Sequence, residues 1–116
     1  MYETTTGTGG IYVKNVDATP DTYKTEFIEY NDTAKTFTAK RNGIFVITVD
    51  RASRSIIRVY YNSTSTYSQY TSANILDNPI ELNVNKDDYI KIWLGSGTTS
   101  TTVNKYCNGN LLFRPT

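Results

Sequence analysis

The run Ile44–Ile47 constrains the fold of this chain most, because every position in it is apolar and it directly follows Asn42-Gly43. Asn-Gly between two strand-like segments is typical of a β-hairpin turn, since both residues tolerate a positive φ angle. In an antiparallel sheet with one solvent-exposed face, apolar and polar residues alternate along each strand. A strand that is apolar on both faces therefore indicates a sheet covered on both sides, or a sheet whose outer face meets another chain.

Length and composition point to one all-β domain. The chain has 116 residues, enough for one hydrophobic core and too few for two domains. No segment shows sustained apolar periodicity of the helical kind, and tyrosine, threonine, serine and asparagine are abundant. Short strand-like segments separated by turn residues predict an antiparallel two-sheet jelly-roll sandwich. We expect strands at 26–30, 36–40, 44–51, 56–61, 80–84 and 90–94.

The apolar positions that alternate along these strands are expected to form the core. The predicted core residues are Phe37, Phe45, Ile47, Ile57, Val59, Leu82, Val84, Ile90, Ile92 and Leu112.

Residues 1–10 and the charge balance set limits on domain organisation and partners. Residues 1–10 have the composition of a flexible N-terminal linker, and 11–116 are expected to form a single jelly-roll head domain. The net charge of +1 does not predict a nucleic-acid-binding surface. No apolar run reaches the length of a membrane span, and the first residues lack the features of a signal peptide. The single cysteine, Cys107, excludes an intrachain disulfide and is expected in the core or at an interface.

The residue types do not favour a catalytic or cofactor site. The chain has no histidine, so Ser-His and Cys-His arrangements cannot form. Glu26 and Glu29 are expected on opposite faces of a strand. Asn83, Asn85 and Asp87 resemble the alternating oxygen ligands of a calcium loop, but the pattern lacks the glycine and the distal glutamate, so a polar hairpin turn is favoured. We expect no enzyme activity, no cofactor and no metal.

The segment 62–74, rich in serine, threonine, tyrosine and asparagine, is either a wet edge strand or a long loop. Tyrosine supplies rigid contact area at low entropic cost, and its planar ring suits the face of a sugar. Arginine can hold an anionic group through two parallel hydrogen bonds. The candidate binding residues are therefore Tyr60, Tyr67, Tyr70, Arg54 and Arg58. The alternative is an edge strand with exposed tyrosines and no ligand.

An ordered set of motifs resembles a known family. The set begins with Tyr30-Asn31-Asp32 and continues through 35–39, 42–46 and 80–90 to Gly109-Asn110-Leu111-Leu112-Phe113. In this order the motifs resemble the jelly roll shared by the complement-q globular head and tumour necrosis factor. The sequence departs from the family at Asn42, Asp87 and Asn110, where a proline, a glycine and an apolar residue are usual. In this resemblance Asn110 would face the core and need a hydrogen-bond partner there, or the register would be shifted.

The resemblance implies a homotrimer around a threefold axis, built from the inner sheets. By alternation, Phe45, Ile47 and Val49 would fill the sandwich, and Leu112 would point into it. The implied interface residues, which would face the axis, are Ile44, Val46, Thr48, Leu111 and Phe113. A contiguous apolar outer face of this kind marks an interface in a soluble protein.

Together these features predict a non-enzymatic binding domain, the trimeric head at the C-terminus of a phage or surface fibre. Such a head would bind a host cell-surface receptor, a glycan or a protein, at the exterior of a virion or cell. No nucleic acid and no membrane insertion are expected. One alternative is a structural trimerisation, capsid-decoration or spore-surface domain without a specific ligand. Another is a secreted cytokine-like head, because one fold serves many functions.

Overall fold

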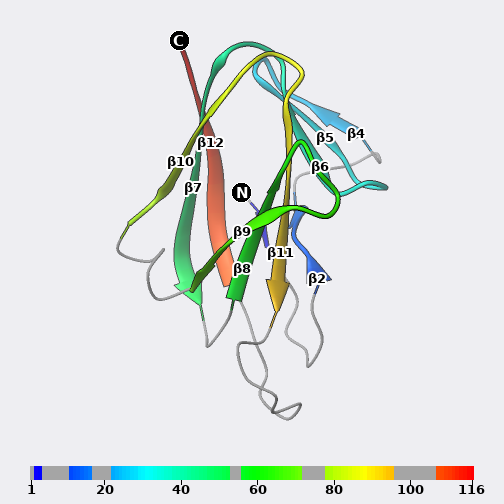
Figure 1. Cartoon of the computed structure of the whole chain (residues 1–116). Coiled ribbons are helices and arrows are strands. Elements are labelled where there is room, and N and C mark those ends of the chain that lie inside the picture. Colours follow the sequence, from blue (N-terminus) through cyan, green and yellow to red (C-terminus); the bar gives the residue numbers. More distant parts are fainter. Residues whose placement is uncertain (1, 4–10, 17–21, 53–55, 72–77, 96–106) are drawn as a thin grey trace.

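The computed structural model describes residues 2–3, 11–16, 22–52, 56–71, 78–95 and 107–116. Across these ranges the chain forms strands, turns and bends and no helix, which confirms the all-β prediction. The strands form two antiparallel sheets that pack against each other (Figure 1). None of the described segments is a helix long and apolar enough to cross a membrane.

The two sheets differ in the strands that they contain. Sheet A has the strand order β10 (Ile80–Val84), β7 (Gly43–Ala52), β12 (Cys107–Pro115), β1 (Tyr2–Glu3) and β3 (Lys14–Asn15). Sheet B has the order β4 (Thr22–Lys24), β5 (Ile28–Asn31), β6 (Thr36–Ala39), β11 (Tyr89–Gly95), β8 (Ile56–Tyr61) and β9 (Tyr67–Thr71). In addition, β2 (Ile11–Tyr12) pairs with the end of β11. In Figure 1 the long strand β7 lies between β10 and β12, as expected for a central strand.

Two segments singled out in the sequence correspond to strands. The segment 56–61 forms β8, and the segment 67–71 forms β9, an exposed edge strand of sheet B. The turn at 32–35 joins β5 and β6 as a hairpin. Strand β1 lies in the segment expected to be a linker and pairs with β12 and β3, while residues 1 and 4–10 lie outside the described part.

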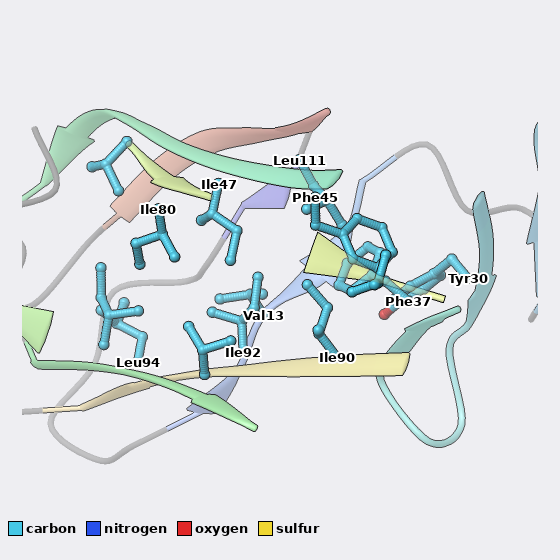
Figure 2. Close-up of a cluster of buried hydrophobic side chains, with 14 of the residues drawn as sticks. Val13, Tyr30, Phe37, Phe45, Ile47, Ile80, Ile90, Ile92, Leu94 and Leu111 are labelled. Atoms are coloured by element: carbon cyan, nitrogen blue, oxygen red, sulfur yellow. The ribbon is translucent and has the colours of Figure 1, made fainter. Parts of the chain in front are cut away.

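The hydrophobic core lies between the sheets (Figure 2). The burial of most predicted positions is confirmed, namely of Phe37, Phe45, Ile47, Val49, Ile57, Val59, Val84, Ile90 and Ile92. Leu82 is half-buried and packs against the same cluster. The core also contains Val13, Tyr30, Ala39, Ile80, Leu94 and Leu111. Tyr30 is fully buried because its phenol finds a partner, donating a hydrogen bond to Asp32 Oδ1 at 2.9 Å.

The prediction that Leu112 points into the core is wrong. Its side chain is 54% exposed, whereas Leu111 is 9% exposed. In the pairing of β12 with β7, Leu111 lies opposite Ile47, and Leu112 lies opposite Val46. Directly opposite residues of an antiparallel pair share a face, so the inward Ile47 brings Leu111 inward. A difference of one residue in register reverses every side chain of β12.

The predicted hairpin turn at Asn42-Gly43 is also wrong. Strand β6 lies in sheet B and β7 in sheet A, so this connection crosses between the sheets. Neither residue has a positive φ angle; among the described non-glycine residues such angles occur at Lys35, Asn62 and Asp87. A β-carbon at Gly43 would collide with the Phe113 ring and with the carbonyl oxygen of Arg114. The close approach of β12, and not a turn, therefore requires glycine at this position.

The polar turn at 85–88 is a crossover from β10 to β11 and not the expected hairpin. The Asp88 carboxylate holds the turn, accepting hydrogen bonds from the Tyr61 hydroxyl, the Asn85 N–H at 2.8 Å and Asn62 Nδ2 at 2.9 Å. The hydrogen bond from Tyr61 is the main reason that the pKa of Asp88 is lowered, and the same bond raises the pKa of Tyr61.

Across the described ranges, no group of three histidine, cysteine, aspartate or glutamate side chains is placed to hold a metal ion.

Candidate binding site

The outer face of sheet B carries aromatic and cationic side chains from several strands. Directly opposite residues of antiparallel strands lie on the same face. The register therefore places one row of side chains across the sheet at Tyr12, Trp93, Arg58 and Gln69. The neighbouring row consists of Thr36, Lys91, Tyr60 and Tyr67. The aromatic face, as we call it, comprises Tyr12, Arg58, Tyr60, Tyr67, Lys91 and Trp93.

Strand alternation turns the aromatic face away from the core. In β11, Lys91 and Trp93 flank Ile92, which is 1% exposed and points into the sandwich. In β8, Arg58 follows Ile57, which is also 1% exposed. Because side chains alternate along a strand, the residues beside these inward positions must point outward. Figure 2 shows Ile92 directed between the sheets.

Arg58 lies between two aromatic rings. Its guanidinium carbon is 4.5 Å from the centroid of the Tyr67 ring and 4.5 Å from that of Trp93. Its Nε donates a hydrogen bond to Gln69 Oε1 at 3.2 Å. Cation–π contacts on a protein surface contribute about 0.5–1 kcal/mol each. The contacts to Tyr67, Trp93 and Gln69 therefore restrict the Arg58 side chain before any ligand arrives.

Three tyrosines and a lysine extend this arrangement. The Tyr60 ring lies between those of Tyr12 and Tyr67, with centroid distances of 6.0 Å and 5.4 Å. Lys91 Nζ is 4.2 Å from the centroid of the Tyr12 ring. Tyr60 is 7% exposed, whereas Tyr12 and Tyr67 are 36% and 41% exposed. Tyr60 thus supports the two rings that a ligand can reach.

Gly95 makes room for the Trp93 indole. A β-carbon at Gly95 would collide with the six-membered ring of the indole. The two residues are two positions apart in β11, so a side chain at 95 would occupy the same face as Trp93. The absence of a side chain at Gly95 allows the indole to occupy the place where Arg58 contacts it.

The two cations of the aromatic face, Arg58 and Lys91, form no ion pair with any described residue. In the part of the chain that the structure describes, the ion pairs are Lys35–Asp32 and Arg114–Glu81, and neither Arg58 nor Lys91 contacts a carboxylate. Burial raises the pKa of the Tyr12 phenol, and the neighbouring Tyr60 adds to this, partly opposed by Arg58. Tyr12 therefore stays protonated at neutral pH and can donate a hydrogen bond.

The structure brings together some of the predicted binding residues and separates others. Tyr60, Tyr67 and Arg58 lie side by side on the aromatic face. Tyr70 is paired with Ile57 and packs against the core from the inner side of β9. Arg54 lies outside the described residues.

Sequence reasoning missed Trp93, Lys91 and Tyr12 as members of the site. The alternation in 90–94 already placed Lys91 and Trp93 on the outward side of a strand. What the sequence did not contain was the pairing of β11 with β8 and β2, which brings these residues beside Arg58 and Tyr12.

The outer face of sheet A is apolar at its centre. Val46 lies opposite Leu112 across β7 and β12, and Ile44 lies two residues before Val46 on the same side. We call Ile44, Val46 and Leu112 the apolar patch. Arg114 on β12 lies opposite Ile44, and Glu81 on β10 lies opposite Val46, so the 2.7 Å ion pair between them reaches across β7 at the patch.

Thr48 and Asn110 extend this outer face beyond the apolar patch. The Asn110 N–H donates to Thr48 Oγ1 at 3.2 Å, so Asn110 pairs on the outer side and does not face the core. Leu111 and Phe113, expected on the outer side, point into the sandwich instead. Phe113 stacks on Phe27 at 5.6 Å between ring centroids.

Comparisons with known proteins add no relative. No protein-family model, no curated protein and no solved structure matches this chain.

Proposed function

We propose that this chain is a non-enzymatic receptor-binding head domain that assembles as a homotrimer at the tip of a phage or cell-surface fibre. The observation that carries the proposal is Arg58 held between Tyr67 and Trp93 on an outward sheet face. Ligand sites combine apolar or aromatic contact area with a few fixed polar groups. The aromatic face offers both, and a host-surface glycan is the receptor class that planar rings and hydrogen-bond donors suit best.

The apolar patch supports self-association. Leu112 is exposed and lies directly beside Val46, so two apolar side chains from different strands form one surface. Exposed apolar groups that cluster in this way favour association with another chain. Closed threefold symmetry buries such a surface in every subunit and ends the assembly at a defined size.

The two faces belong to different sheets, which allows both roles at once. The aromatic face lies on the outside of sheet B, and the apolar patch lies on the outside of sheet A. Association through sheet A therefore leaves sheet B open to a receptor. This division also agrees with the resemblance to the complement-q and tumour-necrosis-factor jelly roll, whose members trimerise through inner sheets.

A structural trimerisation domain without a ligand is the second candidate. The apolar patch favours it independently of the aromatic face, because the patch needs no receptor. For a receptor-binding head, substitutions on the aromatic face should weaken ligand binding. For a purely structural domain, there is no ligand binding to weaken.

A glycan array combined with light scattering tests the proposal. The unaltered chain should be a trimer and should bind saccharides, and Tyr67→Ala should weaken saccharide binding roughly tenfold or more while leaving the trimer intact. Lys86→Gln is the matched control, because Lys86 is an exposed cation on the turn between β10 and β11, outside the aromatic face. A trimer that binds no saccharide on the array would favour the structural candidate.

A further inference from the structure

We infer that the aromatic face binds an acidic saccharide, with a sugar carboxylate held by Arg58 and Lys91 and the sugar ring lying on the exposed tyrosines. The inference rests on the proposed receptor-binding function of the same face and names the class of its ligand.

Arg58 has hydrogen-bond donors to spare. Its Nε donates to Gln69, and among the described residues neither Nη group makes a hydrogen bond, so both can serve a ligand. The planar guanidinium fork matches the geometry of a carboxylate, which accepts two parallel hydrogen bonds from it. Contacts to Tyr67 and Trp93 already restrict the side chain, so binding loses less conformational entropy.

Lys91 supplies the second positive charge. Arg58 is paired with Trp93, and Lys91 precedes Trp93 by two positions. The two cations are therefore diagonal neighbours on one face, roughly 7–8 Å apart between backbones. Neither contacts a carboxylate in the described ranges, so no ion pair among the described residues offsets their mutual repulsion. A bound anion between them removes that repulsion, and a neutral ligand does not.

The exposed tyrosine rings are placed to contact the sugar ring of the ligand. Tyr12 and Tyr67 are the exposed rings of the aromatic face, and they lie on either side of the nearly buried Tyr60. Arg58 lies over the Tyr67 ring and Lys91 over the Tyr12 ring, so it is the remaining exposed part of each ring that offers apolar contact area to the C–H groups of a sugar beside the cations. The hydroxyls of both rings can pair with sugar hydroxyls. A simple inorganic anion would leave these rings unused.

The charge distribution favours a saccharide over a single-stranded nucleic acid. A nucleic acid carries a phosphate at every nucleotide, and its binding groove follows the backbone with a series of cations. The aromatic face offers two cations, and the whole chain has a net charge of +1. A ligand with one carboxylate next to a sugar ring matches two cations better than a chain of phosphates does.

Titration of the intact chain with charged and neutral forms of the same sugar tests the inference. The probes are oligogalacturonate, oligomannuronate and sialyllactose, each compared with its methyl ester, in which the carboxylate is neutral and the ring unchanged. Trp93 is the single tryptophan of the chain, so its fluorescence reports on the aromatic face directly. We expect at least one acid to bind roughly tenfold or more tightly than its ester. We also expect that preference to weaken as salt is raised.

Variants identify the groups responsible. Arg58→Lys keeps the charge but loses the fork, and it should reduce the acid-over-ester preference, as should Lys91→Gln. Lys86→Gln, which removes an equal charge outside the face, should leave the preference unchanged. Isothermal titration calorimetry of each variant gives the affinities, and circular dichroism checks the fold.

The outcomes separate the inference from the proposed function. Equal binding of acids and esters, or a preference that survives both variants, overturns the inference and leaves receptor binding in place. Binding to none of these sugars and to no saccharide on the array overturns both. Tighter binding of an oligothymidylate than of every acidic sugar, at the same salt, assigns the face to nucleic acid and also overturns the inference.

Discussion

The Trp93 indole lies over Gly95, two residues further along β11, where a β-carbon would collide with it. The same indole contacts the Arg58 guanidinium at 4.5 Å, so the absence of a side chain at one position sets the place of a cation on the neighbouring strand. The proposed binding site thus depends on a residue that contributes no functional group to it.

Gly95→Ala should displace the indole and weaken ligand binding more than it weakens the fold. Inserting a methyl group where no space exists typically destabilises a protein by about 1–3 kcal/mol. A shift in Trp93 fluorescence, read together with urea unfolding, measures both effects. The control is Asn83→Ala on the exposed outer side of β10. An unchanged emission spectrum in Gly95→Ala would contradict the assigned position of the indole.

Leu112→Asp and Leu111→Ala should have different effects, although the two residues are adjacent. A charge at the exposed Leu112 should disrupt the proposed trimer and yield monomer or aggregate, because three like charges would be buried together without partners. Leu111→Ala removes a core side chain and should cost about 2–5 kcal/mol of stability without changing the subunit number.

Light scattering and chemical unfolding distinguish these results. Val46→Asp should behave like Leu112→Asp, since the two residues lie opposite each other, and Thr64→Asp in the exposed β8–β9 loop should stay assembled. If the unaltered chain is a monomer in solution, the trimer is wrong and a lone adhesive sandwich becomes the better proposal.

Gly43→Ala should destabilise the fold more than Asn42→Ala. A methyl group at Gly43 forces β7 and β12 apart, because the Phe113 ring and the Arg114 carbonyl occupy its place. Asn42→Ala loses the hydrogen bond that Asn42 Oδ1 accepts from the Lys86 N–H at 2.8 Å, a change of about 1 kcal/mol. Urea unfolding of both variants measures the difference. A larger loss in Asn42→Ala would show that the connection, and not the strand contact, limits stability.

The Tyr61–Asp88 pair should stabilise the fold within a pH window. The pKa of Asp88 is lowered in the folded chain, so its contribution is present above the unfolded value of about 4 and is lost as the pH falls through the folded value. The pKa of Tyr61 is raised, so its contribution is present below about 10 and is lost as the pH rises through the folded value.

Tyr61→Phe tests this window by removing the hydrogen bond without altering the ring. The free energy of unfolding should fall at neutral pH, and the difference from the unaltered chain should shrink as the pH falls through the lowered pKa of Asp88. Asp32 also has a lowered pKa, chiefly through Lys35, so part of the acid dependence should persist in the variant. A constant difference between the two chains from neutral to acid pH would mean that the pair does not couple to folding.

The local pattern determined which residues form strands and, for most of them, which side faces inward. The alternation in β8 and β11 predicted the burial of Ile57, Ile90 and Ile92, because a side-chain period of two needs no knowledge of neighbouring strands. The candidate residues Arg58, Tyr60 and Tyr67 were chosen for their residue types and their closeness in the sequence, and they come together because β8 and β9 are consecutive strands that pair.

Only the tertiary structure decided which strands pair and in what register. The Asn42-Gly43 dipeptide has the local signature of a hairpin, yet the strands on either side of it belong to different sheets, because β6 pairs with β5 and β11 whereas β7 pairs with β10 and β12. Leu111 and Leu112 are both apolar, so the sequence pattern does not show which of them points into the core. The register of β12 with β7 decides this, and it turns Leu112 outward. The same long-range pairing brings Trp93, Lys91 and Tyr12 together with Arg58. Contacts between distant parts of the chain decide strand pairing and register, because the local sequence favours no one pairing or register over the others.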